Sequence, residues 1–310
     1  MPVLDDLFSR RIVFVTGKGG VGKSTIAAAL ALEGAQRGRR TLLIDVEAKG
    51  DAARFLDSGP PGYAAKQAGD GLWHLALDPA EALDEYLRVG LKIPRMYRIG
   101  PLHKVFDFIA TAAPGIREVL IAGKVGFEER AVRDGAKRWD LIVVDAAPSG
   151  QVLSHLRGPR TLQELVGVGL IRNQTEWVRV VLEDPAVSGI VVVSLAEEMP
   201  VAETAELIEQ VPTQVDTPVL AVVANRIVEP LAHASALSGI TPDILGAPTG
   251  ALQDAVALRS RLAANQAPMR DRLRSLGPPV LEVPLMPVSR HTLSVTRSVS
   301  DALREADVAG

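Results

Sequence analysis

The chain has 310 residues, 47% of them hydrophobic and 23% charged, and a net charge of −3 at pH 7. This composition is ordinary for a globular protein, and it argues against global disorder and against a general polyanion-binding surface. The chain contains 0 Cys, which excludes disulfides, thiolate zinc sites, iron–sulfur clusters and cysteine nucleophiles.

The sequence carries no sign of a targeting segment. Its first residues, MPVLDDLFSRR, lack the long apolar stretch that a signal peptide needs. No window approaches the length of a membrane span. We therefore expect a cytoplasmic protein without direct membrane insertion, and the net charge predicts no nucleic-acid partner.

Seven short apolar stretches predict strands. In chain order they are 11–16, 40–45, 72–78, 139–146, 189–195, 218–225 and 278–285. Most are almost continuously apolar, as are strands buried on both faces of a parallel sheet, whereas 72–78 alternates and is expected at an edge. Helical stretches lie between most of them, so repeated βαβ units predict an α/β fold, with a mostly parallel, layered sheet flanked by helices.

We expect one domain, 1–310, with two helical insertions, because two connections are longer than a crossover requires. Residues 229–277 predict a long helix that is interrupted near Pro268. Residues 79–138 hold a run of apolar residues at helical spacing, namely Ile99, Leu102, Val105, Phe106 and Ile109. Such stripes often only pack against the core, so the insertions are expected either to complete it or to lie above the sheet.

A glycine-rich loop follows the first strand. Gly17 through Ser24 reads GKGGVGKS and satisfies the pattern G-x-x-x-x-G-K-[ST] between a strand and a helix. Its backbone N–H groups are expected to surround phosphate oxygens at the positive end of the helix. Lys23 is expected to bridge the terminal phosphates, and the Ser24 hydroxyl to bind Mg²⁺. The loop therefore predicts a nucleoside triphosphate site, with cofactors ATP and Mg²⁺. The residues expected to bind the nucleotide here are Gly17, Lys18, Gly19, Gly20, Val21, Gly22, Lys23, Ser24 and Thr25.

Two acidic positions are expected at the same edge of the sheet. Asp145 ends a buried strand, where α/β sheets bind ligands, and it suits the water shell of Mg²⁺. The AAPSG turn that follows it is a candidate sensor of the γ-phosphate. Asp45 and Glu47 lie two residues apart after the second strand, so one of them could orient the attacking water. A solvated acidic loop is the alternative for Glu47.

These motifs, in this order, resemble a known family. GKGGVGKS is similar to the deviant P-loop of the MinD, ParA and nitrogenase iron-protein class. The rest resembles the ArsA/Get-type ATPases, and looks most like the actinobacterial "anion-transporting ATPase" members. Further stretches that carry the resemblance, which covers nearly the whole chain, are IDVEAKGD, APGIREVL, VVDAAPSGQVLSHLR, VVANR and PLMP.

The resemblance implies roles for particular residues. Lys18 matches the signature lysine, which reaches phosphate bound by the other subunit of a face-to-face dimer. A second in-subunit phosphate contact is the alternative for Lys18. Asn225 and Arg226 would read the adenine base, and the stretch from Pro284 through Met286 to Pro287 would line its other side. The catalytic residues implied are Lys18, Lys23, Glu47 and Asp145.

The sequence also departs from the family. Glu47 stands where the family has its water-positioning aspartate, so slow turnover is expected. The zinc-binding cysteine pair of the targeting factors and the arsenite-binding cysteines are absent. The expected function is a dimeric Mg-ATPase, a homodimer or a heteromer, that couples ATP and ADP states to a protein client or partner complex and is not arsenite-stimulated.

Three other functions are also compatible with the sequence. The chain could be a nucleotide-switched binding module with negligible turnover, in a heteromer with a related subunit. It could be a positioning ATPase of the MinD/ParA kind, although its last residues, SVTRSVSDALREADVAG, are charge-balanced and look only weakly amphipathic. It could also be a small-molecule kinase or synthetase on the same scaffold.

Overall fold

We analysed a computed structural model of the chain. It describes residues 2–47, 51–60, 62–90, 116–165, 170–233, 237, 239, 249–286 and 292–309. The helices are Val3–Ser9 (α1), Lys23–Gln36 (α2), Asp51–Phe55 (α3), Pro79–Glu85 (α4), the π-helix Tyr86–Gly90 (η1), Ile116–Arg130 (α6), Ser149–Leu165 (α7), Leu170–Glu183 (α8), Glu198–Gln214 (α9), Gly250–Arg274 (α12) and Leu293–Ala309 (α13). The strands are Ile12–Gly17 (β1), Thr41–Asp45 (β2), Lys66–Gly69 (β3), Leu72–Ala76 (β4), Val132–Arg133 (β5), Ala136–Lys137 (β6), Leu141–Asp145 (β7), Ser188–Leu195 (β8), Val219–Ile227 (β9) and Val280–Pro284 (β10).

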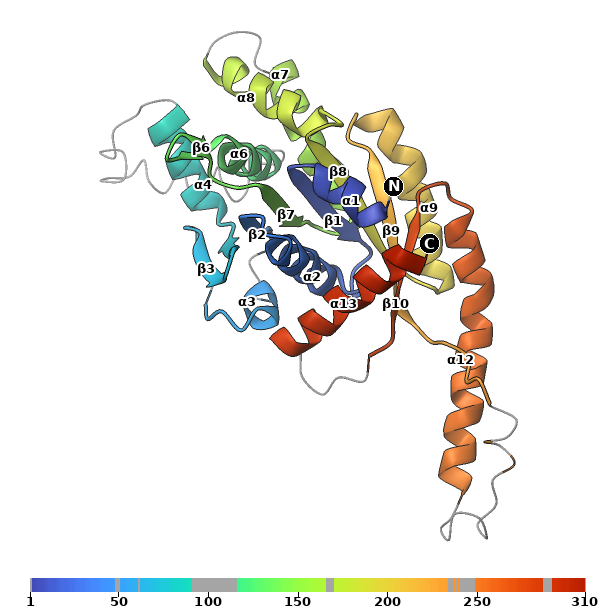
Figure 1. The fold of residues 1–310 in the computed structure, drawn as a ribbon. Coiled ribbons are helices and arrows are strands. Elements are labelled where there is room, and N and C mark those ends of the chain that lie inside the picture. The colour runs from blue at the N-terminus through green and yellow to red at the C-terminus, as the bar shows by residue number, and fades with distance from the viewer. Residues whose placement is uncertain are drawn as a thin grey trace.

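An eight-stranded sheet forms the centre of the molecule, in the order β10-β9-β8-β1-β7-β2-β4-β3 (Figure 1). Every pair is parallel except β3 with β4. All seven predicted strands are present, and the predicted α/β class is confirmed. Because the parallel strands end at one edge, the segments that follow β1, β2, β7, β8 and β9 meet there.

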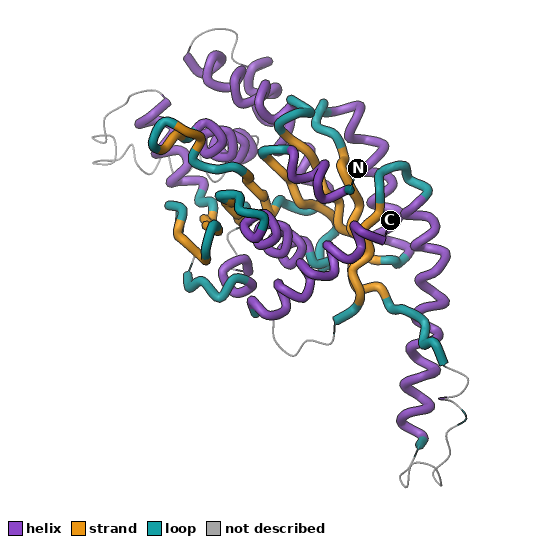
Figure 2. Tube along the Cα trace, in the orientation of Figure 1, coloured by secondary structure: helices purple, strands orange, loops and turns teal. Residues whose placement is uncertain are grey.

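Helices cover both faces of the sheet, as Figures 1 and 2 show. On one face α1, α2 and α13 pack on the side chains of Val13, Val15 and Val143. On the other face α6, α7, α8 and α9 pack on Phe14 and Ile44, among others. Helix α2 is buried from Ile26 to Ala31 because the sheet lies on one side of it and α13 on the other. This packing fixes the position of the loop that precedes α2.

Two sequence predictions were wrong in detail. Strand β4 is not at the edge, because the short, polar β3 pairs with it antiparallel and occupies the edge position. Helix α12 is not interrupted at Pro268 but continues to Arg274. A proline inside a helix costs roughly 3 kcal/mol. Here the turns after it are tied to Glu282 of β10 by Arg270 and Arg274.

The two predicted insertions differ in how far they can be described. Of 79–138, the run from Ile99 to Ile109 lies outside the described residues, while helix α6 forms at Ile116–Arg130. Of 229–277, helix α12 extends away from the sheet in Figure 1. Among the helices of the described ranges, none is both long and apolar enough to cross a bilayer.

The C-terminal residues are more clearly amphipathic than the sequence suggested. Helix α13 buries Thr296, Val299, Ser300 and Leu303, and this face lies on α2 and β10. Its apolar side is therefore part of the protein core.

Candidate functional site

The loop between β1 and α2 has the backbone conformation that its glycines permit. Gly17 has φ +146°, and a Cβ atom there would lie 2.0 Å from the carbonyl oxygen of Val193 on β8. Gly22 has φ +98° and caps α2 in the left-handed region. A side chain at Gly22 would lie 2.4 Å from Asn225 Nδ2. The loop thus needs glycine both for its φ angles and for its close approach to two neighbouring strands.

Lys23 is the first residue of α2, and its side chain is buried. Its Nζ donates to the backbone oxygen of Lys18 at 3.2 Å, so the ammonium group lies over the loop. Ser24 and Thr25 follow in the first helical turn. This places a cation and two hydroxyl-bearing residues at the positive end of α2, as an anion-binding loop requires.

Lys18 has a partner that the sequence analysis did not identify. Its Nζ lies 2.5 Å from Oε1 of Glu203, a residue of α9. The two side chains are 30% and 35% exposed. The pair joins the loop to a helix 185 residues further along the chain, so no local pattern could have revealed it.

Acidic residues meet beside the loop. Asp45 and Asp145 are direct register partners on the adjacent strands β2 and β7, and both are buried. Burial raises the pKa of Asp145 to about 7, a hydrogen bond with Ser24 and the charge of Lys23 oppose that rise, and the charges of Asp45 and Glu47 add to it. The site therefore holds more negative charge than its buried cation balances.

These oxygen atoms fit a magnesium ion. The Ser24 hydroxyl and the Asp145 carboxylate are hard oxygen donors, and a divalent cation would relieve the repulsion around Asp145. In the described ranges no three His, Asp or Glu side chains form a cluster that could hold a metal ion.

The charge of Glu47 acts on both Asp145 and a buried histidine, His155. Glu47 follows β2 in a bend, and its charge raises the pKa of Asp145. Burial lowers the pKa of His155 on α7, while the charges of Glu118 and Glu47 oppose that change. Glu118 on α6 has a buried Oε2 atom without a hydrogen-bond partner in the described part of the chain. The sequence analysis missed His155 and Glu118, which lie inside the quoted motifs but match no common catalytic pattern.

Of the residues expected to contact the base, Asn225 binds the loop. Asn225 Nδ2 donates to the Val21 carbonyl at 2.8 Å, and Asn225 Oδ1 accepts from the Arg226 N–H at 2.9 Å. Pro284 pairs with Ile227 in the β9–β10 ladder. Met286 is half-buried beyond it, and Pro287 lies outside the described residues. Asn225 thus supports the loop, and base reading by this group stays a prediction.

The structure brings most of the predicted site together. Lys18, Lys23, Ser24 and Asp145 lie around the loop, with Glu47 within electrostatic reach of Asp145. Asn225 contacts the loop from β9. The other predicted loop positions, Gly19, Gly20 and Val21, lie between Lys18 and Gly22 as expected.

Comparisons with known proteins agree with this site. Residues 10–179, more than half of the chain, match the family model described as "Anion-transporting ATPase". The chain is similar to ATPase BagA of Mycobacterium tuberculosis, with 38% identity over 228 residues, which are 70% of this chain and 65% of that protein. It is also similar to ATPase GET3 of Phaeosphaeria nodorum, with 28% identity over 53% of this chain and 49% of that protein. ATPase ASNA1 homolog 2 of Paramecium tetraurelia is 28% identical over 50% of this chain and 46% of that protein.

The matches thus extend over about two thirds, or less, of the length of these relatives. The predicted resemblance to the ArsA/Get-type ATPases is confirmed by the family match and by these relatives, and the family match contains GKGGVGKS. This chain belongs to the anion-transporting ATPase (ArsA) family.

Proposed function

We propose that this protein binds ATP with Mg²⁺ at the Gly17–Thr25 loop and hydrolyses it slowly as a cytoplasmic dimer. The observation that carries the proposal is the loop itself, in which Lys23 is folded over the backbone beside the buried Asp145. Membership of an ATPase family supports the choice of nucleotide.

Each residue near the loop has a distinct task in this proposal. The loop amides and Lys23 bind the phosphates, and the positive end of α2 favours their charge. Ser24 binds Mg²⁺ directly and Asp145 binds it through water. When bound, the ion would neutralise charge on the phosphates. Glu47, which follows the end of β2, orients the attacking water.

Lys18 would act in trans. For this it must leave Glu203, to which it is paired within its own chain, and reach the γ-phosphate held by a second subunit. A cation supplied across an interface stabilises transition-state charge and makes nucleotide part of the contact between subunits. Both side chains are partly exposed, so the exchange of partners costs little desolvation.

We further propose that the nucleotide state controls binding to a protein client or partner complex. Helix α12 extends from the sheet edge next to Asn225, and it contacts both β9 and α9. These are the elements that hold Asn225 and Glu203. A client bound to α12 would therefore be close to two groups that contact the loop.

A second candidate is a nucleotide-switched binding module with negligible turnover. The Lys18–Glu203 pair favours it, because a lysine retained by Glu203 would not reach a partner's phosphate. Glu47 favours it as well, since its longer side chain stands where the family has aspartate. In this case the chain would bind ATP tightly within a heteromer with a related subunit.

One experiment tests both candidates. We would measure ATP turnover by the purified chain with Mg²⁺, together with its mass in solution with and without a non-hydrolysable ATP analogue. Slow hydrolysis with an analogue-dependent dimer would support the cycling ATPase. Tight binding without turnover or self-dimer would support the binding module, and no binding at all would overturn both.

A further inference from the structure

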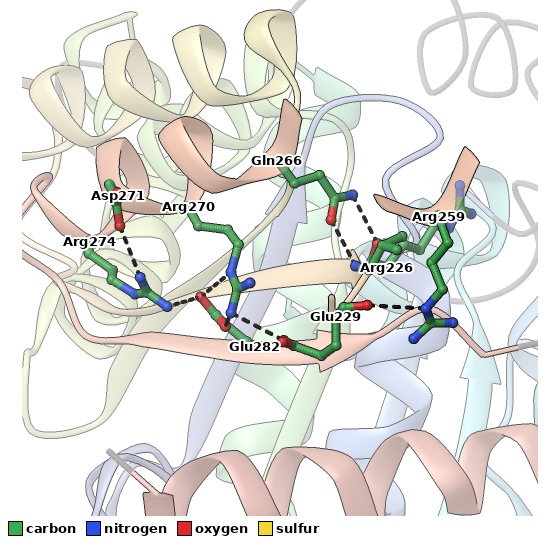
Figure 3. Close-up of polar contacts among 9 residues, drawn as sticks. Arg226, Glu229, Arg259, Gln266, Arg270, Asp271, Arg274 and Glu282 are labelled. Carbon is green, nitrogen blue, oxygen red and sulfur yellow. Dashed lines mark hydrogen bonds and ion pairs between the residues drawn. The ribbon is translucent and has the colours of Figure 1, made fainter. Parts of the chain in front are cut away.

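Helix α12 is held beside the sheet by ion pairs in its C-terminal half, and in its N-terminal half Arg259 donates to the Glu229 carbonyl at 3.1 Å. Of its 25 residues, only Val256, Ala263 and Leu273 are buried. The ion pairs lie in the second half: Arg270 binds Glu282 of β10 at 2.5 Å and Glu229 at 3.2 Å. Arg274 also binds Glu282, at 2.6 Å (Figure 3). Because Glu229 and Glu282 come from the segments after β9 and within β10, these pairs fix the helix beside the sheet edge.

Gln266 makes a different kind of contact, because it binds backbone rather than charge. Its Oε1 accepts from the N–H of Val228 at 2.7 Å, and its Nε2 donates to the carbonyl of Arg226 at 3.2 Å. One amide thus holds the backbone on both sides of Ile227, and Figure 3 shows it directed at this strand end from α12. The oxygen of the Gln266 amide thus accepts one hydrogen bond, and its nitrogen donates another.

The backbone held in this way is strained. Arg226 has φ +57°, in the left-handed region that residues other than glycine rarely adopt. The contacts on each side of Arg226 hold this conformation. Gln266 binds its carbonyl, and Asn225 Oδ1 accepts its N–H at 2.9 Å.

From Asn225 the contacts continue to the phosphate-binding loop. Asn225 Nδ2 donates to the Val21 carbonyl at 2.8 Å, and this side chain is buried. A continuous chain of hydrogen bonds therefore runs from Gln266 through Arg226 and Asn225 to Val21. Its middle member, Arg226, is the residue with the strained backbone, and its N–H binds the Asn225 side chain.

We propose that Gln266 is a positioning residue of the phosphate-binding loop, and that it couples helix α12 to that loop through Arg226, Asn225 and Val21. The functional meaning of this coupling rests on the proposed nucleotide binding. Since coupling between two sites is reciprocal, nucleotide in the loop stabilises the contact of α12 with the sheet edge, and a change in α12 alters nucleotide affinity.

The test compares Gln266→Met with Gln253→Met, the same change at an exposed position of α12. Calorimetry should show that Gln266→Met weakens Mg-ATP about fivefold, as the loss of one to two neutral hydrogen bonds would. Gln253→Met should leave the affinity unchanged. Without nucleotide, hydrogen exchange at the amides of residues 19–23 should become faster in Gln266→Met alone.

A double-mutant cycle with Asn225→Ala separates positioning from general destabilisation. If the effect passes through Asn225, Gln266→Met should change the ATP affinity less than about twofold in the Asn225→Ala background. Equal effects in both backgrounds would overturn the proposal. So would unchanged exchange of residues 19–23 in Gln266→Met.

Two further measurements apply if Gln266→Met does not fold or if the wild-type protein binds no ATP. Should Gln266→Met fail to fold, wild-type protein serves instead: ATP must slow exchange of the Val228 amide, and unchanged exchange there refutes the coupling. Should wild-type protein bind no ATP, the proposed function fails, while exchange at residues 19–23 without nucleotide still decides whether Gln266 positions the loop.

Discussion

Two buried carboxylates lie near the two ends of helix α2, and their surroundings differ. Asp145, 6% exposed, lies beside Ser24 at the N-terminal end, and burial together with the charges of Asp45 and Glu47 raises its pKa to about 7. Glu33, 2% exposed, lies near the other end. Burial alone would raise the pKa of Glu33, but hydrogen bonds from Arg304, Arg37 and Ser300 outweigh it and lower the pKa.

The comparison separates an acid whose charge is disfavoured in the folded chain from one whose charge is stabilised by hydrogen bonds. At Glu33 the chain supplies its own cations, with Arg304 and Arg37 at 2.7 and 2.9 Å. At Asp145 the neighbouring acids leave a charge that a bound cation can neutralise. Substitutions at the two ends should therefore affect different properties, with function lost at one end and stability at the other.

The largest effect on ATP binding is expected for Lys23→Ala. Removing the ammonium group that lies over the loop should weaken ATP by about a hundredfold or more, because it eliminates a charge-assisted contact with the terminal phosphates. The thermal unfolding midpoint should change little. Calorimetric titration with ATP and a thermal melt check both parts, and a variant that retains wild-type affinity would remove Lys23 from the site.

Lys18→Ala should have the largest effect on catalysis and little effect on binding. If Lys18 acts in trans, turnover should fall on the order of a thousandfold, and the ATP-dependent dimer should disappear while ATP still binds. Glu203→Gln is the matched variant, because it releases Lys18 without removing it. It should favour the dimer. Steady-state hydrolysis and mass in solution distinguish these outcomes, and a Lys18→Ala protein that still dimerises with ATP would contradict the trans role.

Asp145→Asn, near the N-terminal end of α2, should raise thermal stability and lower ATP hydrolysis. The amide removes a carboxylate that is disfavoured by burial and by its acidic neighbours, so at pH 8 the nucleotide-free protein should melt about 2 °C higher. Hydrolysis should fall by about a hundredfold because a magnesium contact is weakened. Melting curves and ATPase assays measure the two effects, and a fall in both would show that Asp145 is structural like Glu33.

The smallest effect is expected for Glu33→Gln. Two arginines lose a charged partner, so the free energy of unfolding should fall by about 1–3 kcal/mol at pH 7, with ATP affinity unchanged. Because the pKa of Glu33 is lowered in the folded state, its contribution is present above the ordinary carboxyl pKa of 4.5 and is lost as the pH falls below it. Urea unfolding at pH 7 and at pH 3.5 should show the difference between the proteins shrinking.

The sequence predicted the parts of this molecule that depend on local pattern. Continuous apolar runs such as 189–195 gave the buried strands, and the spacing of Gly17, Gly22 and Lys23 identified the loop. Strand β3 was missed because it is only four residues long, KQAG, and has no run of large apolar residues. Pro268 suggested a helix end because the anchoring of Arg270 and Arg274 on β10 is a tertiary contact.

The missed parts of the site have the same cause. Glu203 and Gln266 lie on helices and look like ordinary solvated residues of those helices. Their contacts with Lys18 and with the backbone around Ile227 join positions 185 and about 40 residues apart. Only the folded arrangement of α9 and α12 beside the sheet brings them to the loop.

The packing of α13 on α2 has a consequence for how the protein folds. Ser300 and Arg304 bind Glu33 across 267 and 271 positions, and Leu4 binds Asp307 across 303. Contacts of such long sequence separation close slowly. During synthesis, the side of α2 that α13 covers stays exposed until residue 303 and its neighbours have left the ribosome. Substitutions in α13 should therefore lower the yield of folded protein more than they lower nucleotide affinity.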